Sequence, residues 1–372
     1  MKSLTAFLKK EIVFSIACIL AVASCFFVTP SSDYISYIDF RTLSLLLGLM
    51  LVVQGLKSCR VFDFLISILI QRVKSKRQLT LMLVMVCFFS SMLITNDVAL
   101  ITFIPFTIIL LDYLDDPGYN IYLIVMETIA ANLGSMLTPI GNPQNLYLFS
   151  LSAMNIKQFI SLMLPYAALS LSLLVAGSLL VKPDRLTNTE YNSVSRSALP
   201  KIKLIIYFVL FGICLCTVLS VLDYRIMLLI VLICIILCDY NLIFKADYVL
   251  LFTFIAFFIF IGNIKNIPCI NHWLSALTRD RECITGILSS QVISNVPAAM
   301  LLSGFTTDFD GLIIGCNLGG LGTIIASMAS LISFKFYGKT SGSSTGKYLL
   351  CFSLINVVFL SLLFFLYMLI HR

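Results

Sequence analysis

Long apolar runs separated by short polar segments dominate this chain. A helix needs about 20 apolar residues to cross the hydrocarbon core of a bilayer, and several runs reach or approach that length. The pattern therefore predicts an all-α membrane protein that crosses the bilayer many times. The predicted continuous spans are 11–29, 42–57, 158–181, 203–222, 225–240, 246–263 and 348–370.

Four further apolar runs are interrupted near their centres. Runs 79–112 and 282–304 each break once at a short polar tip, which predicts two re-entrant hairpins. Runs 121–149 and 311–333 break at glycine-rich segments, which predicts two broken helices. The shorter run 61–71 is expected to lie at the interface or to enter the membrane only shallowly. In total, the pattern predicts about ten to eleven transmembrane helices.

The composition supports a lipid bilayer as the surroundings of the chain, because 60% of the residues are hydrophobic and only 12% are charged. A soluble domain is about 25% charged. The segment Val22–Cys25 resembles a lipoprotein cleavage site, but apolar residues continue to Val28, so a retained first span is expected. Most cysteines lie singly in apolar runs. Cys269 and Cys283 flank a predicted loop, and the sequence does not decide whether they pair.

The distribution of Lys and Arg predicts the orientation of the chain. If both hairpins return to their starting side and the N-terminus is cytoplasmic, 18 of the 25 basic residues lie in the cytoplasm and the C-terminus lies outside. This arrangement explains the net charge of +7 without a nucleic-acid partner. The expected location is the cytoplasmic (inner) membrane. The polar loop 182–202 then links a first half, 1–181, to a second half, 203–372.

The two halves repeat the same motifs in the same order. Ile94-Thr95-Asn96-Asp97 corresponds to Ile293-Ser294-Asn295-Val296, and Asn132-Leu133-Gly134 corresponds to Asn317-Leu318-Gly319. The charge distribution makes the first hairpin enter from the cytoplasm and the second from outside. The sequence therefore predicts two inverted repeats, an architecture typical of secondary transporters. Spans 11–71 and 203–263 are expected to form the scaffold.

The hairpin tips carry the first group of candidate site residues. A helix that starts at such a tip offers N–H groups to an anion, and a helix that ends there offers carbonyl oxygens to a cation such as Na⁺. The alternative is that the polar side chains only cap the broken helices. The candidate residues at the tips are Thr95, Asn96, Ser294 and Asn295.

The broken helices carry the second group. Two prolines and two glycines between positions 134 and 143 prevent a regular helix in the first half. The alternative for this segment is a turn outside the membrane; the alternative for the glycines of the second half is close helix packing. The candidate residues are Asn132, Gly134, Ser135, Thr138, Gly141, Asn142 and Asn145 in the first half and Asn317, Gly319, Gly320 and Thr323 in the second.

Few charged residues lie within the apolar runs, chiefly Asp97, Glu127 and Asp63. A carboxylate inside the membrane is costly and usually functional. Asp97 could bind a cation, relay a proton or select among anions, or it could only cap the helix that follows. Glu127 could instead lie near the cytoplasmic mouth. The predicted core segments contain no Lys or Arg, so an anion would be held by helix dipoles, amides, hydroxyls and a bound cation.

Enzyme classes find little support in the sequence. The chain has two histidines and no HExxH motif, paired-cysteine metal spacing, P-loop or dinucleotide fingerprint. We therefore expect neither catalytic residues nor a bound cofactor or structural metal. Transport would then use an ion gradient, with Na⁺ or H⁺ as the coupling ion.

The motifs resemble those of the ion transporter superfamily, which groups citrate-type carriers, arsenite permeases, divalent-anion/sodium symporters and one class of sodium–proton antiporters. ITNDVALITFIPFTI (94–108) is similar to their first hairpin, and ANLGSMLTPIGNPQNLYL (131–148) to the broken helix that follows. SQVISNVPAAMLL (290–302) and NLGGLGTIIASMASLI (317–332) are similar to the second-repeat counterparts. The resemblance is strongest to bacterial citrate-transporter-like inner-membrane proteins and covers nearly the whole chain.

The resemblance implies one central site between two inverted repeats. It implies Na⁺ at Thr95, Asn96, Ser294 and Asn295, an elevator-like or rocking cycle, and a homodimer, because related carriers often form dimers. The expected function is transport of a small anionic solute, a carboxylate or an inorganic oxyanion. The alternatives are a Na⁺/H⁺ antiporter, a metalloid efflux permease of the arsenite type, and a membrane sensor that transports nothing.

Overall fold

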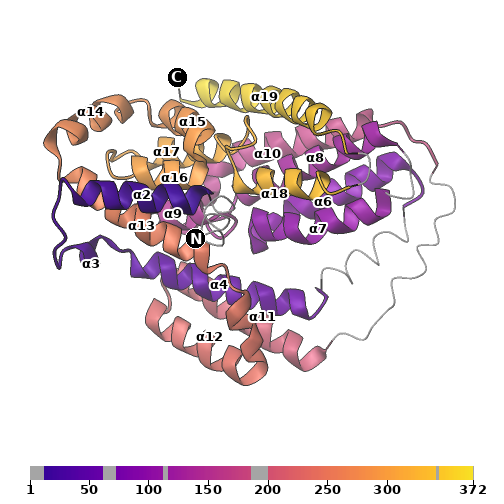
Figure 1. Cartoon of the computed structure of the whole chain (residues 1–372). Coiled ribbons are helices and arrows are strands. Elements are labelled where there is room, and N and C mark those ends of the chain that lie inside the picture. Colours follow the sequence, from indigo (N-terminus) through magenta and orange to yellow (C-terminus); the bar gives the residue numbers. More distant parts are fainter. Residues whose placement is uncertain (1–11, 62–72, 112–115, 186–199, 341–342, 372) are drawn as a thin grey trace, which may run out of the picture.

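The computed structural model describes residues 12–61, 73–111, 116–185, 200–340 and 343–371. These residues form helices and connecting loops, and no strand occurs among them beyond one isolated bridge between Ser75 and Arg185 (Figure 1). The prediction of an all-α fold is confirmed. In chain order the helices are α2 (Ile12–Cys25), α3 (Tyr34–Tyr37), α4 (Phe40–Ser58), α6 (Lys76–Ile94), α7 (Asn96–Leu111), α8 (Pro117–Ser135), α9 (Pro143–Leu151), α10 (Ile156–Leu180), α11 (Lys201–Val218), α12 (Tyr224–Asp239), the 3₁₀ helix η2 (Tyr240–Lys245), α13 (Tyr248–Lys265), α14 (Pro268–Thr278), α15 (Glu282–Ile293), α16 (Asn295–Leu302), α17 (Phe309–Leu318), α18 (Met328–Tyr337) and α19 (Thr345–Ile370).

The predicted interruptions occur where the sequence indicates them. Runs 79–112 and 282–304 are the helix pairs α6–α7 and α15–α16, each joined through one residue. Runs 121–149 and 311–333 are the pairs α8–α9 and α17–α18, each separated by a short loop. The first span is shorter than predicted, because α2 ends at Cys25. Segment 62–71 and most of the predicted linker, 186–199, lie outside the described residues.

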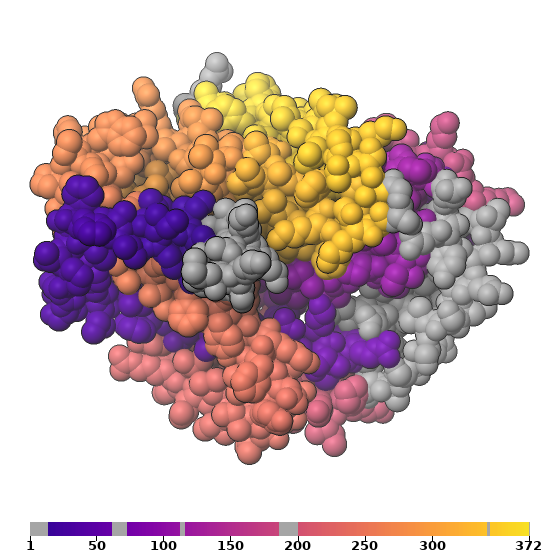
Figure 2. All heavy atoms as spheres, in the orientation of Figure 1, coloured from indigo at the N-terminus to yellow at the C-terminus, as the bar shows by residue number. Residues whose placement is uncertain are grey.

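Several helices have the length and composition of membrane spans. Within the described part of the chain, seven are long and apolar enough to cross a bilayer. The exposed side chains on their outer faces are largely apolar, as Leu237 on α12 and Leu350 on α19 illustrate, and lipid tails suit such a surface. Figure 2 shows α19 as a continuous yellow surface along one edge of the molecule. The seven helical segments are α4, α6, α10, α11, α12 continued by η2, α13 and α19.

The helices pack in two related sets that exchange elements. In the first half α6 packs against α7 and α8, and in the second α15 packs against α16 and α17. The second pieces of the broken helices then cross over: α18 packs against α7 and α8, whereas α9 packs against α16 and α17. Away from this crossing, α11 and α12 pack on α4, and α2 packs on α13 (Figure 1). The crossing brings the breaks of both halves into the interior.

Candidate functional site

The two hairpin tips have the same backbone conformation. Thr95 has φ 70° and ψ 149°, and Ser294 has φ 72° and ψ 154°. These angles lie close to a region that side-chain-bearing residues rarely enter, and such strain concentrates at functional sites. In both hairpins the next helix begins at the asparagine that follows, Asn96 or Asn295. The repeated polar tip in the sequence therefore corresponds to a repeated, strained turn.

Each tip is bound to the broken helix of its own half. The backbone N–H of Asn96 donates to the carbonyl of Gly141 at 3.1 Å, and that of Asn295 donates to the carbonyl of Ala326 at 2.9 Å. Gly141 and Ala326 hold equivalent positions, because each lies nine residues after the asparagine of its N-L-G motif. The first orphan N–H group of each second hairpin helix is thus satisfied by the neighbouring break.

The asparagines of the N-L-G motifs connect the two halves. Asn132 accepts hydrogen bonds on Oδ1 from Asn96 and Ser327, both at 3.0 Å, and donates to Ser330 Oγ at 3.3 Å. Asn317 donates to Asn145 Oδ1 at 2.7 Å. Ser330 and Asn145 are again equivalent positions, each thirteen residues after its motif asparagine. The side chain of each motif therefore reaches the second broken-helix piece of the other half.

The motif glycines allow the broken helices to approach the hairpins closely. A Cβ on Gly134 would lie 2.0 Å from the carbonyl oxygen of Phe88 and 2.6 Å from Ser91 Oγ. A Cβ on Gly319 would lie 2.6 Å from Ser290 Oγ, and Ser91 and Ser290 are each four residues before a tip residue. Close helix packing, which we considered as the alternative for the second half, thus applies to both halves.

The loop of the first broken helix is buried. Asn142, Gln144 and Asn145 are each at most 3% exposed, so protein atoms and not solvent surround their side chains. Asn142 donates to Ser135 Oγ at 2.7 Å, and Asn145 donates to the carbonyl of Ser135 at 3.3 Å. These bonds replace those that the interrupted helix lacks.

The two loop threonines of the predicted set, Thr138 and Thr323, bond to the hairpin backbone. Thr138 donates to the carbonyl of Met92, and Thr323 donates to the carbonyl of Gln291. Both acceptors lie three residues before a tip residue, so each threonine joins its loop to the first arm of the hairpin. Thr323 is exposed and lines none of the pockets described below. Gly320 lies close to the tip of its own half, the second, where an added Cβ would be 3.1 Å from Asn295 Nδ2.

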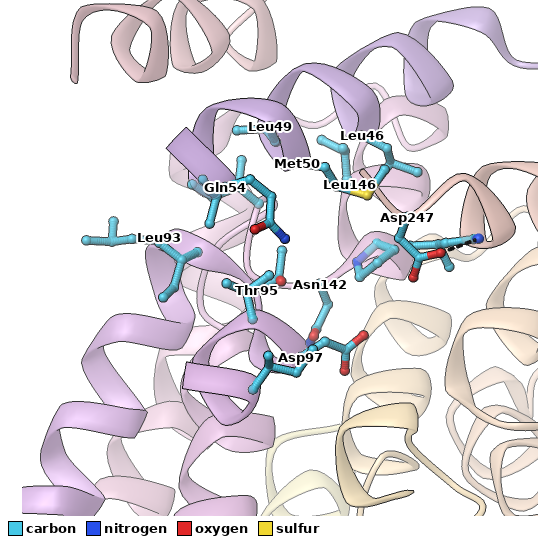
Figure 3. Close-up of a pocket in the computed structure, with 17 residues that line it drawn as sticks. Leu46, Leu49, Met50, Gln54, Leu93, Thr95, Asp97, Asn142, Leu146 and Asp247 are labelled. Carbon is cyan, nitrogen blue, oxygen red and sulfur yellow. Dashed lines mark hydrogen bonds between the residues drawn. The ribbon is translucent and has the colours of Figure 1, made fainter. Parts of the chain in front are cut away.

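A pocket of about 110 Å³ lies beside the first tip, between α4, α9 and α13. Thr95, Asp97 and Asn142 line it, and Figure 3 shows their side chains directed into the same space as Gln54 and Asp247. The sequence analysis did not single out Gln54 or Asp247. Asp247 occupies the N-cap position of α13, where it accepts a bond from the N–H of Leu250. An aspartate just before an apolar run is typical of a helix cap, so nothing in the sequence indicated a place in the pocket. Ser294 and Asn295 do not line this pocket.

Several buried polar atoms near the breaks have no hydrogen-bond partner among the described residues. They include Asn142 Oδ1 in the pocket, Gln144 Nε2 and Asn317 Oδ1. An unpaired polar atom in the interior costs about 1–3 kcal/mol, so such atoms commonly indicate a bound water, ion or solute. All three lie on the broken helices that the sequence identifies.

The predicted acidic residues have different surroundings. Asp97 is the second residue of α7, after Asn96, so the alternative that it caps this helix is wrong. Glu127 is fully buried in α8 and accepts a hydrogen bond from Thr107 at 2.7 Å, so it does not lie at an open mouth. Asp63 is outside the described residues. Cys269 and Cys283 are both free thiols.

Comparison with known proteins identifies the family of the chain. A family model described as citrate transporter matches residues 4–308. The chain is 32% identical to an uncharacterized transporter of Methanocaldococcus jannaschii over 88% of each chain, and 31% identical to the inner membrane protein YbiR of Escherichia coli over 87% of each. It is also 33% identical to the silicon efflux transporter LSI3 of rice (Oryza sativa), over 38% of this chain and 28% of that one. The chain therefore belongs to the citrate transporter family of membrane proteins.

Proposed function

We propose that the protein is a secondary active transporter that moves a small anionic solute, a carboxylate or an inorganic oxyanion, across the cytoplasmic membrane together with Na⁺ or H⁺. The observation that carries the proposal is the crossed asparagine network. Asn132 and Asn317 each contact the broken helix of the other half, so the two halves share one polar centre. Unwound backbone at such a centre is typical of transporter binding sites.

The proposal includes the inverted orientation of the halves. Equivalent contacts recur at the tips, the glycines, the threonines and the asparagines. Two inverted halves that enter from opposite sides would place both tips near the midplane of the membrane. If the two halves then exchange conformations, the site between the tips opens alternately to each side. The solute would lie between the tips, near Asn96 and Asn295.

The pocket beside the first tip supports a coupling cation. Among the described residues that line it, Asp97 and Asp247 are the only ionisable ones, and the unpaired Asn142 Oδ1 adds a neutral oxygen. Oxygen ligands of this kind suit a proton, Na⁺ or another hard cation. A cation bound there would also offset the charge of an anionic solute, because no Lys or Arg is among the described residues that line this pocket.

The second candidate function is efflux of a neutral metalloid hydroxide. Two carboxylates in the pocket disfavour an anion that arrives without a cation, and a neutral hydroxylated solute would avoid that repulsion. The similarity to a silicon efflux transporter adds to this alternative. A Na⁺/H⁺ antiporter would use the same two carboxylates with no further solute.

Uptake into proteoliposomes separates these functions. Purified protein would be tested with citrate, succinate, sulfate and arsenite under imposed Na⁺ and pH gradients. We expect uptake of at least one anion, and we expect Asn96→Ala and Asn295→Ala each to abolish it while the protein remains folded in the membrane. Movement of arsenite alone would support the second candidate. Na⁺-driven proton movement without any anion would support antiport, and normal uptake by both variants would exclude the proposed site.

A further inference from the structure

A second cavity lies beside the C-terminal half of α13, whereas the pocket beside the first tip lies at the N-terminal end of that helix. Its volume is about 510 Å³, and it opens between the C-terminal end of α13, the start of α4 and the ends of α9 and α16. We call it the Lys265 vestibule; its polar lining includes Ser36, Asp39, Tyr147, Lys265 and Ser303. The pocket beside the first tip contains Asp247 and Leu250 at the N-terminal end of α13. The 18 residues of α13 span about 27 Å, so the two cavities are at opposite ends of one candidate membrane span.

Lys265 supplies the positive charge of the vestibule. Among the residues that the structure describes, no carboxylate lies within 4.0 Å of its ammonium group. Its stem lies against Gly304, because a Cβ on that glycine would be 2.7 Å from Lys265 Cε. The lysine of α13 thus extends to the end of α16, one residue from Ser303. A positive charge in a concave apolar surface concentrates anions from solution.

The acidic residue of the vestibule is occupied by other contacts. Asp39 caps α4, and its carboxylate accepts bonds from the backbone and hydroxyl of Thr42 and from the hydroxyl of Ser150. These three donors disperse its negative charge. Asp39 is thus held by three donors, whereas Lys265 has no described carboxylate partner within 4.0 Å that an anionic solute would have to displace.

Two consecutive residues of α9 separate the cavities. Leu146 lines the pocket, and Tyr147 lines the vestibule. Tyr147 shares a buried hydrogen bond of 3.0 Å with Ser303, and its ring lies 5.6 Å from that of Phe258 on α13. This layer joins α9 of the first half to α16 of the second, and it lies between residues that line the two cavities.

We propose that the Lys265 vestibule is a second binding site for small carboxylate or oxyanion solutes. Lys265 holds the negative group, and the Tyr147–Ser303 pair forms the floor beneath it, with the Ser303 hydroxyl donating to the carbonyl of Met300. The solute passes between this site and the first tip when the Leu146–Tyr147 layer opens. This inference rests on the proposed transport of an anion but concerns a separate site at the opposite end of α13.

The test measures binding at the vestibule apart from transport. A cysteine is introduced as Ser36→Cys, and its modification by an anionic and by a cationic methanethiosulfonate is followed by mass spectrometry of the peptide that contains position 36. Citrate and sulfate serve as probes. We expect faster reaction with the anionic reagent and protection by at least one probe, and we expect Lys265→Gln to remove both effects while Lys265→Arg keeps them.

Transport kinetics supply the second readout. Lys265→Gln should raise the KM for the transported anion about tenfold with little change in kcat, since charge focusing in a cleft changes local anion concentration by about that factor or more. Lys157→Gln, which removes an exposed charge at the start of α10, should change neither. Absence of protection by both probes in a protein with normal anion uptake would overturn the proposal. Protection in a protein that transports none of the anions would support the vestibule site and exclude the transport function instead.

Discussion

Asn317 donates a hydrogen bond of 2.7 Å to Asn145 across the two halves of the chain. The equivalent contact joins Asn132 to Ser330 at 3.3 Å. In each contact the motif asparagine of one half bonds to the equivalent position of the other half, as at an interface with two-fold symmetry. This crossed pair of bonds holds the breaks of both halves together in the interior, and it makes the stability of one half depend on the other.

Asn145→Ala should therefore destabilise the protein. The change removes the acceptor of Asn317 Nδ2 and also the longer bonds that Asn145 donates to the carbonyls of Ser135 and Thr138, and loss of one partner of a buried hydrogen bond costs about 1–3 kcal/mol. Thermal unfolding in detergent measures the effect. Asn356→Ala is a matched control, because the amide of this buried asparagine donates to the carbonyl of Phe352 within its own helix. An equal or larger loss in the control would contradict a special role for the contact between halves.

Alanine at the motif glycines should have graded effects. In Gly134→Ala the new methyl group meets the backbone carbonyl of Phe88 at 2.0 Å, so α6 and α8 must separate. In Gly319→Ala the methyl group meets Ser290 Oγ at 2.6 Å and the carbonyl oxygen of Gly315 at 2.8 Å, so its closest backbone contact is less severe than the 2.0 Å contact at Gly134. Overpacking costs about 1–3 kcal/mol or more, and we expect Gly134→Ala at or above the upper end and Gly319→Ala below it.

Gly212→Ala is the control for this series, because its added Cβ meets no described atom within 4 Å beyond its own helix backbone. Alanine should stabilise α11 by about 1 kcal/mol, the difference in helix propensity. Unfolding temperatures of the three variants in one detergent would test the order. A Gly134→Ala protein as stable as the wild type would show that the helices are less closely packed than the structure indicates.

The sequence predicts the breaks of this fold well because the breaks are local. A polar tip such as Thr95-Asn96 in an apolar run, or Pro and Gly around Gly141, interrupts a helix wherever it occurs. The structure accordingly has helix ends within a few residues of the predicted ones. The all-α membrane class follows from the same pattern of apolar runs.

The sequence does not reveal contacts that depend on the crossing of the halves. Ser330 becomes a partner of Asn132 only because α18 packs against α8, and alignment of the two halves would have paired Ser330 with Asn145. Asp247 joins Asp97 because α13 lies across the pocket, which nothing in the local sequence encodes. Thr138 and Thr323 donate to backbone carbonyls of the hairpins, and the local sequence does not indicate these partners.

Glycine at the tip residues should separate stability from function. Thr95 and Ser294 have φ near +70°, and relief of such strain is worth about 1–3 kcal/mol, more than the added flexibility of glycine costs. We expect Thr95→Gly and Ser294→Gly to unfold at the same or a higher temperature and yet to lose most uptake, because the hydroxyls at the tips are gone. A lower unfolding temperature would contradict strain at these turns.

The ion pair between Lys76 and Asp116 should stabilise, at neutral pH, the end of the molecule where α6 and α8 begin. The two groups are 2.7 Å apart, and the hydrogen bond from Lys76 lowers the pKa of Asp116 below its usual 3.8. A lowered folded-state pKa stabilises the protein above the unfolded pKa, and this stabilisation is lost as the pH falls through the folded pKa. Asp116→Asn should therefore lower the unfolding temperature at pH 7 but much less below about pH 3.

Asp223→Asn is the control for this comparison. Asp223 also occupies an N-cap position, where it accepts a bond from the N–H of Arg225, and asparagine retains the capping group. It forms no ion pair with another described residue within 4.0 Å. Equal pH dependence of the two variants between pH 3 and 7 would assign the effect to net charge rather than to the contact with Lys76.

Asp97 and Asp247 should determine how transport depends on its coupling ion. Two carboxylates in one pocket repel each other unless a cation or proton neutralises one of them, and α7 could then move past α13 only with that ion bound. If the ion is a proton, Asp97→Asn should flatten the pH dependence of uptake; if it is Na⁺, the variant should lose Na⁺ stimulation. Asp247→Asn keeps the cap of α13 but removes its charge, and it should weaken the ion dependence about tenfold or more.

Asp223→Asn is the control, because it makes the same change at the cap of α12, away from the pocket. Unaltered pH and Na⁺ profiles in both pocket variants would exclude a coupling role for this pair.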